Sequence, residues 1–179
     1  QEVDPILGPE MRSTGEVLGL SQFYGEAFFK AQEATQTKLP HGGTVLITVN
    51  NKDKEEMIEV ARDLKQAGFK ILATKGTQKA LADADIVSEF VYKLNEGRPN
   101  IIDFMTNGKI DLLINTPASA NEHIDDSDLR KTAIKKKVPY ITTIAAAKAT
   151  ADGIKSMSLP GCGVVKSLQE LHAEITDKE

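Results

Sequence analysis

The sequence predicts an α/β fold with three layers, in which a mainly parallel central sheet has helices on both faces and a loop-helix segment precedes it. Continuous apolar, β-branched runs recur at 44–49, 69–74 and 111–115, as expected for strands buried on both faces. Helical patterns of about 10–15 residues separate the strands, which is typical of βαβ units. Right-handed crossovers then leave few topologies.

Residues 1–43 differ in character from the rest of the chain. Residues 4–9 contain two prolines and a glycine and show no period, so they predict a loop. Residues 21–37 have a helical pattern whose apolar face is formed by Phe23, Ala27, Phe28 and Ala31, and residues 40–43 indicate a linker. One helix cannot enclose a core, so we expect this face to pack on the rest of the chain or on a missing partner.

The first predicted βαβ unit runs from residue 44 to residue 74. After the strand at 44–49, the segment Asp53–Glu56 has the form of a capping box. The helix after it ends at Gly68, and its apolar stripe consists of Met57, Ile58, Val60, Ala61, Leu64 and Ala67. The next strand is predicted at 69–74.

The remaining elements continue this alternation. Thr77 and Thr143 are predicted helix caps, Pro99 lies near the first position of a helix, and Asn107-Gly108 ends that helix. We expect helices at 77–84, 98–108, 127–137 and 143–154, and one within 164–175. We expect strands at 86–93, 111–115 and 140–141, and one more within 164–175.

Composition excludes several classes of protein. The formal net charge of −4 argues against a general nucleic-acid or membrane-surface binder, since such proteins rely on a basic surplus. With Cys162 as the single cysteine, no intrachain disulfide can form. No apolar run approaches the ~18 residues of a membrane span, and no signal segment is present. We therefore expect a cytoplasmic protein, and the first residue, Gln1, indicates an excised piece.

The carboxyl ends of the predicted strands are where ligands bind in such sheets. At one of them, Thr74 and Thr77 flank Lys75 and Gly76, and a helix begins. Glycine lets the backbone approach an anion, and a helix N-terminus directs free N–H groups toward it. A capped helix with nothing bound is the alternative. Because the topology brings Lys54 and Lys93 to the same edge, a phosphate site is the better interpretation.

Other polar residues fit ordinary structural roles. Asn115 either hydrogen-bonds a base or sugar or caps its own turn, and Tyr140 and Thr142 fit packing and capping. The three histidines, His41, His123 and His172, show no ligand spacing, and 135–137 is most simply a solvated basic face. Neither a metal cluster nor a nucleophile with a base is recognisable. The residues therefore favour a phosphate-ligand binding domain over an enzyme.

Several motifs carry a family resemblance. Asp4-Pro-Ile-Leu-Gly-Pro-Glu-Met-Arg-Ser-Thr-Gly-Glu-Val17 resembles the end of the second ATP-grasp half of the carbamoyl-phosphate synthase large subunit, and residues 23–39 resemble the next helix of that protein. Residues 44–155 resemble the C-terminal allosteric domain of that family, which has the methylglyoxal synthase-like fold. The matching motifs are Ala73-Thr-Lys-Gly-Thr77, Asn95–Ile101, Ile114-Asn-Thr116, Asp128–Thr132 and Pro139–Thr143. The resemblance divides the chain into a synthetase tail with linker at 1–43 and an allosteric domain at 44–179.

The resemblance implies a role for each site residue. Lys54, Thr74, Gly76, Thr77 and Lys93 would hold the phosphate of a nucleotide effector of the UMP or IMP class. Thr48 and Asn115 would lie on the base and ribose side. Tyr140 and Thr142 would be the remnant of an ornithine site whose acidic partners lie upstream of Gln1.

The sequence departs from the family on the base side of the pocket. Pro117 stands where the family has a threonine, and Ala118 and Ala120 are smaller than the usual residues. The phosphate half is therefore complete, while the choice of nucleotide stays open. A methylglyoxal synthase-type lyase is disfavoured because 115–121 lacks an acid. IMP cyclohydrolase, another relative with this fold, is also disfavoured because it lacks the Gly-Pro-Glu-Met leader. A third alternative is a role in oligomerisation, which can coexist with regulation.

The resemblance also implies partners for the parent protein. The fragment itself would have no catalytic residue, no metal and no cofactor. The parent would be a glutamine-hydrolysing ligase that uses ATP with Mg or Mn, serving pyrimidine and arginine biosynthesis. We expect it to act with the rest of the large subunit, with the small glutamine amidotransferase subunit, and with homo-oligomer contacts.

Overall fold

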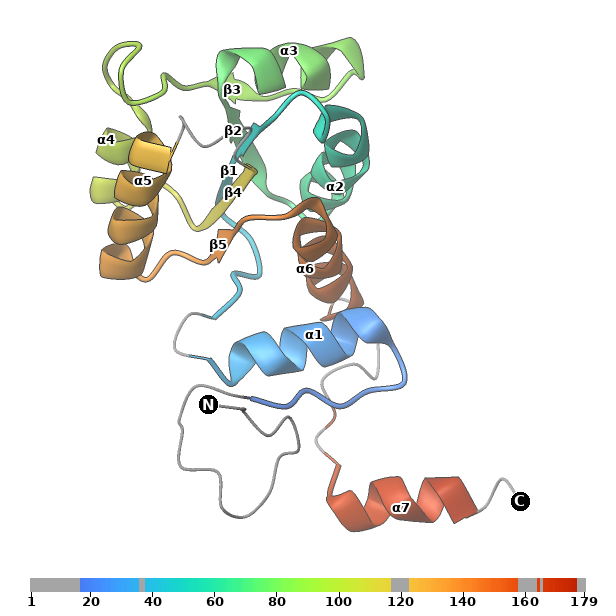
Figure 1. The fold of residues 1–179 in the computed structure, drawn as a ribbon. Helices are drawn as coiled ribbons and strands as arrows, with labels where there is room; N and C mark the ends of the chain where they lie inside the picture. The colour runs from blue at the N-terminus through green and yellow to red at the C-terminus, as the bar shows by residue number, and fades with distance from the viewer. Residues whose placement is uncertain (1–16, 36–37, 117–122, 158–163, 165, 177–179) are drawn as a thin grey trace.

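A computed structural model describes residues 17–35, 38–116, 123–157, 164 and 166–176 (Figure 1). Five strands form one sheet in the order β3-β2-β1-β4-β5, and every pairing is parallel. The strands are β1 (Thr44–Val49), β2 (Lys70–Ala73), β3 (Glu89–Phe90), β4 (Leu112–Thr116) and β5 (Tyr140–Ile141). The predicted parallel α/β sheet is therefore confirmed.

Helices cover both faces of this sheet, so the three-layer prediction is also confirmed (Figure 1). On one face, α2 (Lys54–Gln66) and α6 (Ile144–Met157) pack against alternate strand residues such as Ile47 and Ile114. On the other, α4 (Ile101–Thr106) and α5 (His123–Lys136) enclose Leu46, Leu72 and Leu113. Because both faces are buried, the two central strands β1 and β4 are largely apolar and buried along most of their length.

The order of the strands creates a switch point between β1 and β4. From β1 the chain moves outward to β2 and β3, then returns to place β4 and β5 on the other side. In the β1–β4 register, Thr48 is opposite Asn115 and Val49 is opposite Thr116. Polar residues at the carboxyl ends of the two central strands are therefore neighbours, at the position where open α/β sheets bind ligands.

The N-terminal helix α1 (Tyr24–Glu33) packs against α6 through two glycines (Figure 1). A Cβ on Gly153 would stand 2.9 Å from the carbonyl oxygen of Gly25, and a Cβ on Gly25 would stand 2.9 Å from the backbone of Asp152. Phe29 is fully buried beside this contact. Phe23, the N-cap of α1, does not take part in this packing and is 68% exposed.

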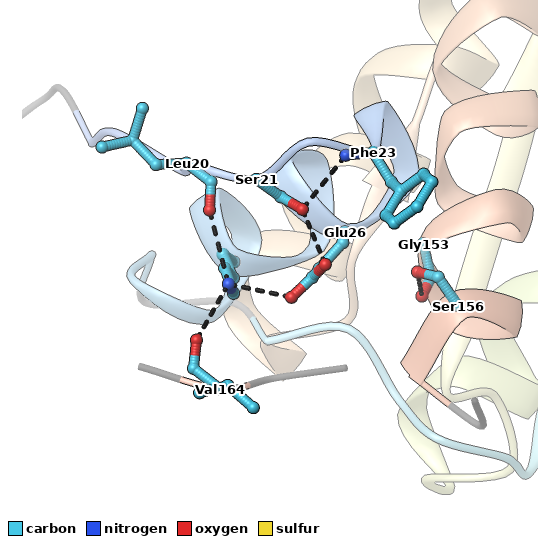
Figure 2. A network of polar contacts seen from close by, with 8 residues as sticks. Leu20, Ser21, Phe23, Glu26, Gly153, Ser156 and Val164 are labelled. Carbon is cyan, nitrogen blue, oxygen red and sulfur yellow. Dashed lines mark hydrogen bonds and ion pairs between the residues drawn. The ribbon is translucent and has the colours of Figure 1, made fainter. Parts of the chain in front are cut away.

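Polar contacts of α1 connect the segment before α1 to the segment after α6 (Figure 2). Lys30 Nζ lies 2.8 Å from Glu26 Oε1 and donates to the carbonyl oxygens of Leu20, at 3.4 Å, and Val164, at 3.2 Å. Ser21 Oγ donates to the other carboxylate oxygen of Glu26 at 2.6 Å. One lysine thus links a residue before α1 to a residue after α6.

Several predicted helix ends differ from the structure. The capping box predicted at Asp53 is absent, because the Asp53 carboxylate accepts a 2.7 Å hydrogen bond from Asn50 Nδ2 instead. The helix expected to start at Thr77 is α3 (Lys75–Asp83), with Thr74 as its N-cap. Helix α4 begins at Ile101, after a capping box formed by Asn100 and Asp103 rather than at Pro99.

Other boundaries shift by a few residues. The predicted strand 86–93 is reduced to β3, at the edge of the sheet, and α5 begins at His123 rather than Ser127. Thr143 caps α6 as predicted, since its Oγ1 accepts from the Ala146 N–H. The last helix is α7 (Leu168–Thr176), and residues 164, 166 and 167 are not a strand. The division of the chain at residue 43 stays a prediction.

Candidate functional site

The start of α3 lies at the carboxyl edge of the sheet, between β1 and β2. Strand β2 ends at Ala73, and α3 begins directly after Thr74, whose side chain makes no cap hydrogen bond. Its Oγ1 donates instead to Thr48 Oγ1 at 3.1 Å, in a buried contact. The backbone N–H groups in the first turn of α3 therefore have no side-chain acceptor on Thr74. Such a helix N-terminus favours an anion.

Thr77 lies inside the first turn of α3 and connects that helix to β1. Its hydroxyl accepts a 3.2 Å hydrogen bond from the Val49 N–H, and the residue is only 2% exposed. The predicted position of Thr77 as the helix cap was wrong, because Thr74 is the N-cap. With Thr48 and Thr74, Thr77 gives the edge three buried hydroxyls.

Lys54 is the first residue of α2, and its ammonium group lies against Gly76. The Nζ atom would stand 3.1 Å from a Cβ built on Gly76, with nothing else closer to that position. Gly76 is therefore the residue that admits the Lys54 ammonium to the start of α3. Within the described part of the chain, the structure shows no ion pair for Lys54. Its charge is available to an anion at this helix N-terminus.

Lys93 lies after β3 and joins the same region from the edge of the sheet. It is exposed, and with Gly76 it lines a depression of about 870 Å³ along α3. Its backbone N–H donates to Glu96 Oε2 at 3.2 Å, while its side chain has no ion pair with another described residue. The structure thus places Lys54, Thr74, Gly76 and Thr77 at the first turn of α3, while Lys93 lines the depression that includes Gly76.

Asn115 lies at the carboxyl end of β4, on the side of the sheet edge that the sequence predicts for the base and ribose. It is 8% exposed, and its Nδ2 donates to the hydroxyl of Tyr140 at 2.8 Å. The guanidinium carbon of Arg130 lies 6.0 Å from the centre of the Tyr140 ring. Thr142 lies half-buried between β5 and α6. Pro117, Ala118, Ala120 and Cys162 lie outside the described residues.

Sequence reasoning missed a polar network between β1 and β4. Asn50 Nδ2 donates to Asp53 Oδ2 at 2.7 Å and to Thr116 Oγ1 at 3.2 Å, and the Asn50 N–H donates to the Thr116 carbonyl at 3.1 Å. This network fixes the turn that leads to Lys54. The signal was present in the Asn50-Asn51 pair, since asparagine after a strand favours turns held by its own side chain.

The arrangement as a whole suits oxyanion binding. It combines a helix N-terminus, two lysines and buried hydroxyls at the carboxyl edge of a parallel sheet, on the β2 side of the switch point between β1 and β4. Among the described residues, no group of three His, Cys, Asp or Glu side chains could hold a metal ion. No helix in the part of the chain that the structure describes is long and apolar enough to cross a membrane.

Comparison with known proteins gives a consistent result. Residues 56–142 match the sequence model of the MGS-like domain family. The chain is 44% identical over 98% of its length to the carbamoyl phosphate synthase large chain of Methanosarcina mazei. It is 46% identical over 96% of its length to that of Acidobacterium capsulatum, and 46% identical over 95% to the C-terminal section of the large chain of Methanopyrus kandleri.

These relatives are much longer than the present chain. It spans 16% of the length of the Methanosarcina mazei and Acidobacterium capsulatum proteins and 31% of the Methanopyrus kandleri protein. The residues that match the MGS-like family, 56–142, include four of the five strands of the sheet, β2 to β5. Through residues 56–142 the chain belongs to the MGS-like domain family, and over nearly its whole length it corresponds to part of the carbamoyl phosphate synthase large chain.

Proposed function

We propose that this chain is a regulatory effector-binding part of a carbamoyl phosphate synthase large chain. It binds the phosphate of a nucleotide of the UMP or IMP class at the carboxyl edge of its sheet. In the parent protein this binding modulates the synthesis of carbamoyl phosphate from ATP, bicarbonate and glutamine. The whole protein would work with a glutamine amidotransferase subunit and serve pyrimidine and arginine biosynthesis in the cytoplasm.

The contact of the Lys54 ammonium with Gly76 at the start of α3 carries the proposal. Lysine is unfavourable at a helix N-terminus, because the helix dipole places partial positive charge there. A bound phosphate would offset both the ammonium group and the free N–H groups. Thr48, Thr74 and Thr77 are buried around this position, and Lys93 approaches from the neighbouring loop.

The proposed mechanism is linkage between effector binding and the state of the whole enzyme. An effector that binds one conformation more tightly shifts the equilibrium by the difference in binding free energy. The Asn115–Tyr140 contact connects the base side of the site to β5 and so to α6. Helix α6 in turn packs on α1, which precedes the sheet in the chain.

Isothermal titration of the chain with UMP, IMP and inorganic phosphate tests the site. We expect saturable binding that Lys54→Met weakens. Lys93→Ala should reduce the binding free energy by about 1.5–3 kcal/mol, as loss of a charge-assisted contact to the phosphate predicts. Lys52→Met is the matched control, because Lys52 is exposed two residues before Lys54. Binding that is absent for all three compounds, or equally sensitive to Lys52 and Lys54, would contradict the proposal.

Regulation itself needs the complete enzyme. We expect Lys54→Met in the full large chain to leave synthesis without effector unchanged and to abolish the response to the nucleotide. An assay for methylglyoxal formation from dihydroxyacetone phosphate separates this role from that of a lyase. Substantial turnover by the isolated chain would overturn the assignment as a binding domain.

A further inference from the structure

Helix α6 lies between α2 and α1 and packs against both of them (Figure 1). Helix α2 begins at Lys54, whose ammonium group lies against Gly76 at the proposed phosphate site. Helix α1 comes before the sheet in the chain and contributes none of the residues of that site. Helix α6 therefore connects the proposed site to a helix that lies outside it.

Two ion pairs join α6 to α2 at matching positions. Lys148 Nζ lies 2.6 Å from Glu56 Oε2, and Lys155 Nζ lies 3.3 Å from Asp63 Oδ1. The partners are seven residues apart on each helix, which is a rise of ~10.5 Å on both. Because the pairs follow the same order along the two helices, α2 and α6 run parallel and keep one register over two turns.

The buried apolar seam, rather than the ion pairs, holds these two helices together. Val60 and Leu64 of α2 belong to the same core cluster as Ala151 and Ile154 of α6. Ion pairs as exposed as these contribute little to stability, because water screens the charges. A slide by one helical turn would keep apolar residues in the seam but would separate both pairs. The ion pairs therefore act on the register of α2 and α6 more than on folding.

On the other side of α6, the contact with α1 is made by backbone. Gly153 lies about 140–160° around the helix from Lys148 and Lys155, so it faces away from α2. A Cβ on Gly153 would stand 2.9 Å from the carbonyl oxygen of Gly25 and 3.3 Å from Phe29 Cβ. Glycine has no side chain that could change rotamer to absorb a displacement of α6. We therefore expect α1 to follow α6, since close-packed elements transmit strain.

We propose that α6 transmits nucleotide binding from the start of α2 to α1, with Lys148 and Lys155 as positioning residues that keep α2 and α6 in register. The inference rests on the proposed function, because it needs an anion at Lys54. A bound phosphate would hold the Lys54 ammonium between α2 and α3 and so restrict the first turn of α2. The seam carries this restriction to α6, and the glycine contact carries it to α1.

Hydrogen exchange of the 179-residue chain with and without UMP tests this route, and IMP is measured in parallel. We expect amides in the first turn of α3 to exchange more slowly with nucleotide bound, which reports on the site. Amides of α1 should also slow, by about fivefold, which is the lower end of the usual coupling between two sites. Calorimetric titration of the same samples gives the nucleotide affinity.

The double variant Lys148→Met/Lys155→Met separates the route from the site. It should leave the UMP affinity within about twofold, because both lysines are in α6 and not at the start of α3. It should remove most of the slowing in α1. Lys131→Met/Lys135→Met is the matched control, since it removes the same charge from α5, where Lys131 pairs with Asp128 of its own helix.

An exchange of charges tests whether the pairing itself matters. Asp63→Lys places two cations together and should weaken the response of α1. Asp63→Lys/Lys155→Asp restores an ion pair and should recover the response, which is not expected of residues that only support folding. Asp63 comes nine residues after Lys54, so these substitutions leave the phosphate site intact. Thermal unfolding of each variant checks its stability.

Regulation of the full large chain gives a second readout. Lys148→Met/Lys155→Met should leave synthesis without effector unchanged and reduce the response to saturating nucleotide by about twofold or more. An unchanged response would overturn the proposal.

The outcomes separate the two proposals. If amides of the site slow but those of α1 do not, the route is wrong and the phosphate site stands. If α1 slows equally in Lys148→Met/Lys155→Met, another contact carries the signal and the route is again wrong. A fall in UMP affinity that matches the loss in α1 would mean that the lysines act on the site itself, which also overturns the route. If neither UMP nor IMP binds, both proposals fall.

Discussion

Asn115 and Tyr140 are joined by a 2.8 Å hydrogen bond, in which Asn115 Nδ2 donates to the tyrosine hydroxyl. The family resemblance places these residues in separate effector sites, one on the nucleotide side and one on the ornithine side. Because β4 and β5 are adjacent and parallel, both side chains reach the same edge of the sheet. The two halves of the edge are therefore in direct contact.

Replacement of Tyr140 by phenylalanine tests this contact. Loss of the hydroxyl removes an acceptor for Asn115, so we expect a stability loss of about 1 kcal/mol. UMP affinity should fall, because the amide of Asn115 loses its orientation, while affinity for inorganic phosphate should not change. Thermal unfolding and titration measure the two effects. Tyr24→Phe is the control, since Tyr24 is 72% exposed, and an equal effect of both substitutions would contradict this role.

Gly76→Ala separates binding from stability. Alanine is better than glycine inside a helix by about 0.5–1 kcal/mol, so α3 should be unchanged or slightly more stable. The added Cβ would stand 3.1 Å from Lys54 Nζ, which must then shift by a few tenths of an ångström, and the Cβ would occupy the space beside the ammonium group at the start of α3. We therefore expect weaker phosphate binding without loss of stability. Gly42→Ala is the control, because no atom lies within 4 Å of its Cβ position, and unchanged phosphate affinity in Gly76→Ala would disprove this interpretation.

Thr77→Val removes a hydroxyl that serves both the fold and the site. The Val49 N–H would lose its part-buried 3.2 Å contact with Thr77 Oγ1, at a cost of about 1–3 kcal/mol in stability. Thr77→Ser keeps the hydroxyl and should recover most of that stability. Urea unfolding of the two variants gives the comparison. Equal stability of the valine and serine variants would show that the hydrogen bond contributes little.

Much of the fold is predictable from local sequence pattern. Strands β1 and β5 have the predicted bounds, and the helical stripe of α2 faces the core as expected. These segments are predictable because burial on both faces of the sheet leaves a continuous apolar run, and burial of one helix face leaves a period of 3.6 residues.

The errors arise where a distant residue decides the local structure. The period of α1 shows that one face is apolar, but the burial of Phe29 depends on the close approach of Gly153 of α6, which a local pattern does not reveal. The Asp53 carboxylate, which would otherwise cap α2, instead accepts a hydrogen bond from Asn50 Nδ2. At the site, the residue types were predictable, but the Asn115–Tyr140 hydrogen bond depends on strand order.

Lys30→Met tests the link between the two flanking segments. The substitution removes the Lys30 ammonium from Glu26, whose side chain is 10% exposed, and it removes the donor to Leu20 and Val164. We expect a loss of about 1–3 kcal/mol and faster amide exchange in α1. Lys38→Met is the control, since the exposed Lys38–Glu33 pair should contribute less than about 1 kcal/mol. Equal losses in both variants would rule out a special role for Lys30.

The last prediction concerns the pH dependence of α7. The Ser167 N–H donates to Glu170 Oε2 at 2.6 Å, and Ser167 Oγ donates to the same oxygen at 2.8 Å. These bonds favour the ionised carboxylate, so the pKa of Glu170 lies below its ordinary value of 4.5. A lowered pKa means that the contribution to helix stability is present above pH 4.5 and is lost as the pH falls through the folded pKa.

Acidification should therefore fray the first turn of α7 before the sheet unfolds. Amide chemical shifts of residues 167–170 and of β1, followed from pH 6 to about pH 3 where carboxylates become protonated, distinguish local fraying from global unfolding. Glutamine retains a capping side chain but cannot ionise, so Glu170→Gln should remove the pH response of α7 and leave that of β1 unchanged. An identical response of α7 in this variant would mean that another group controls the end of the helix.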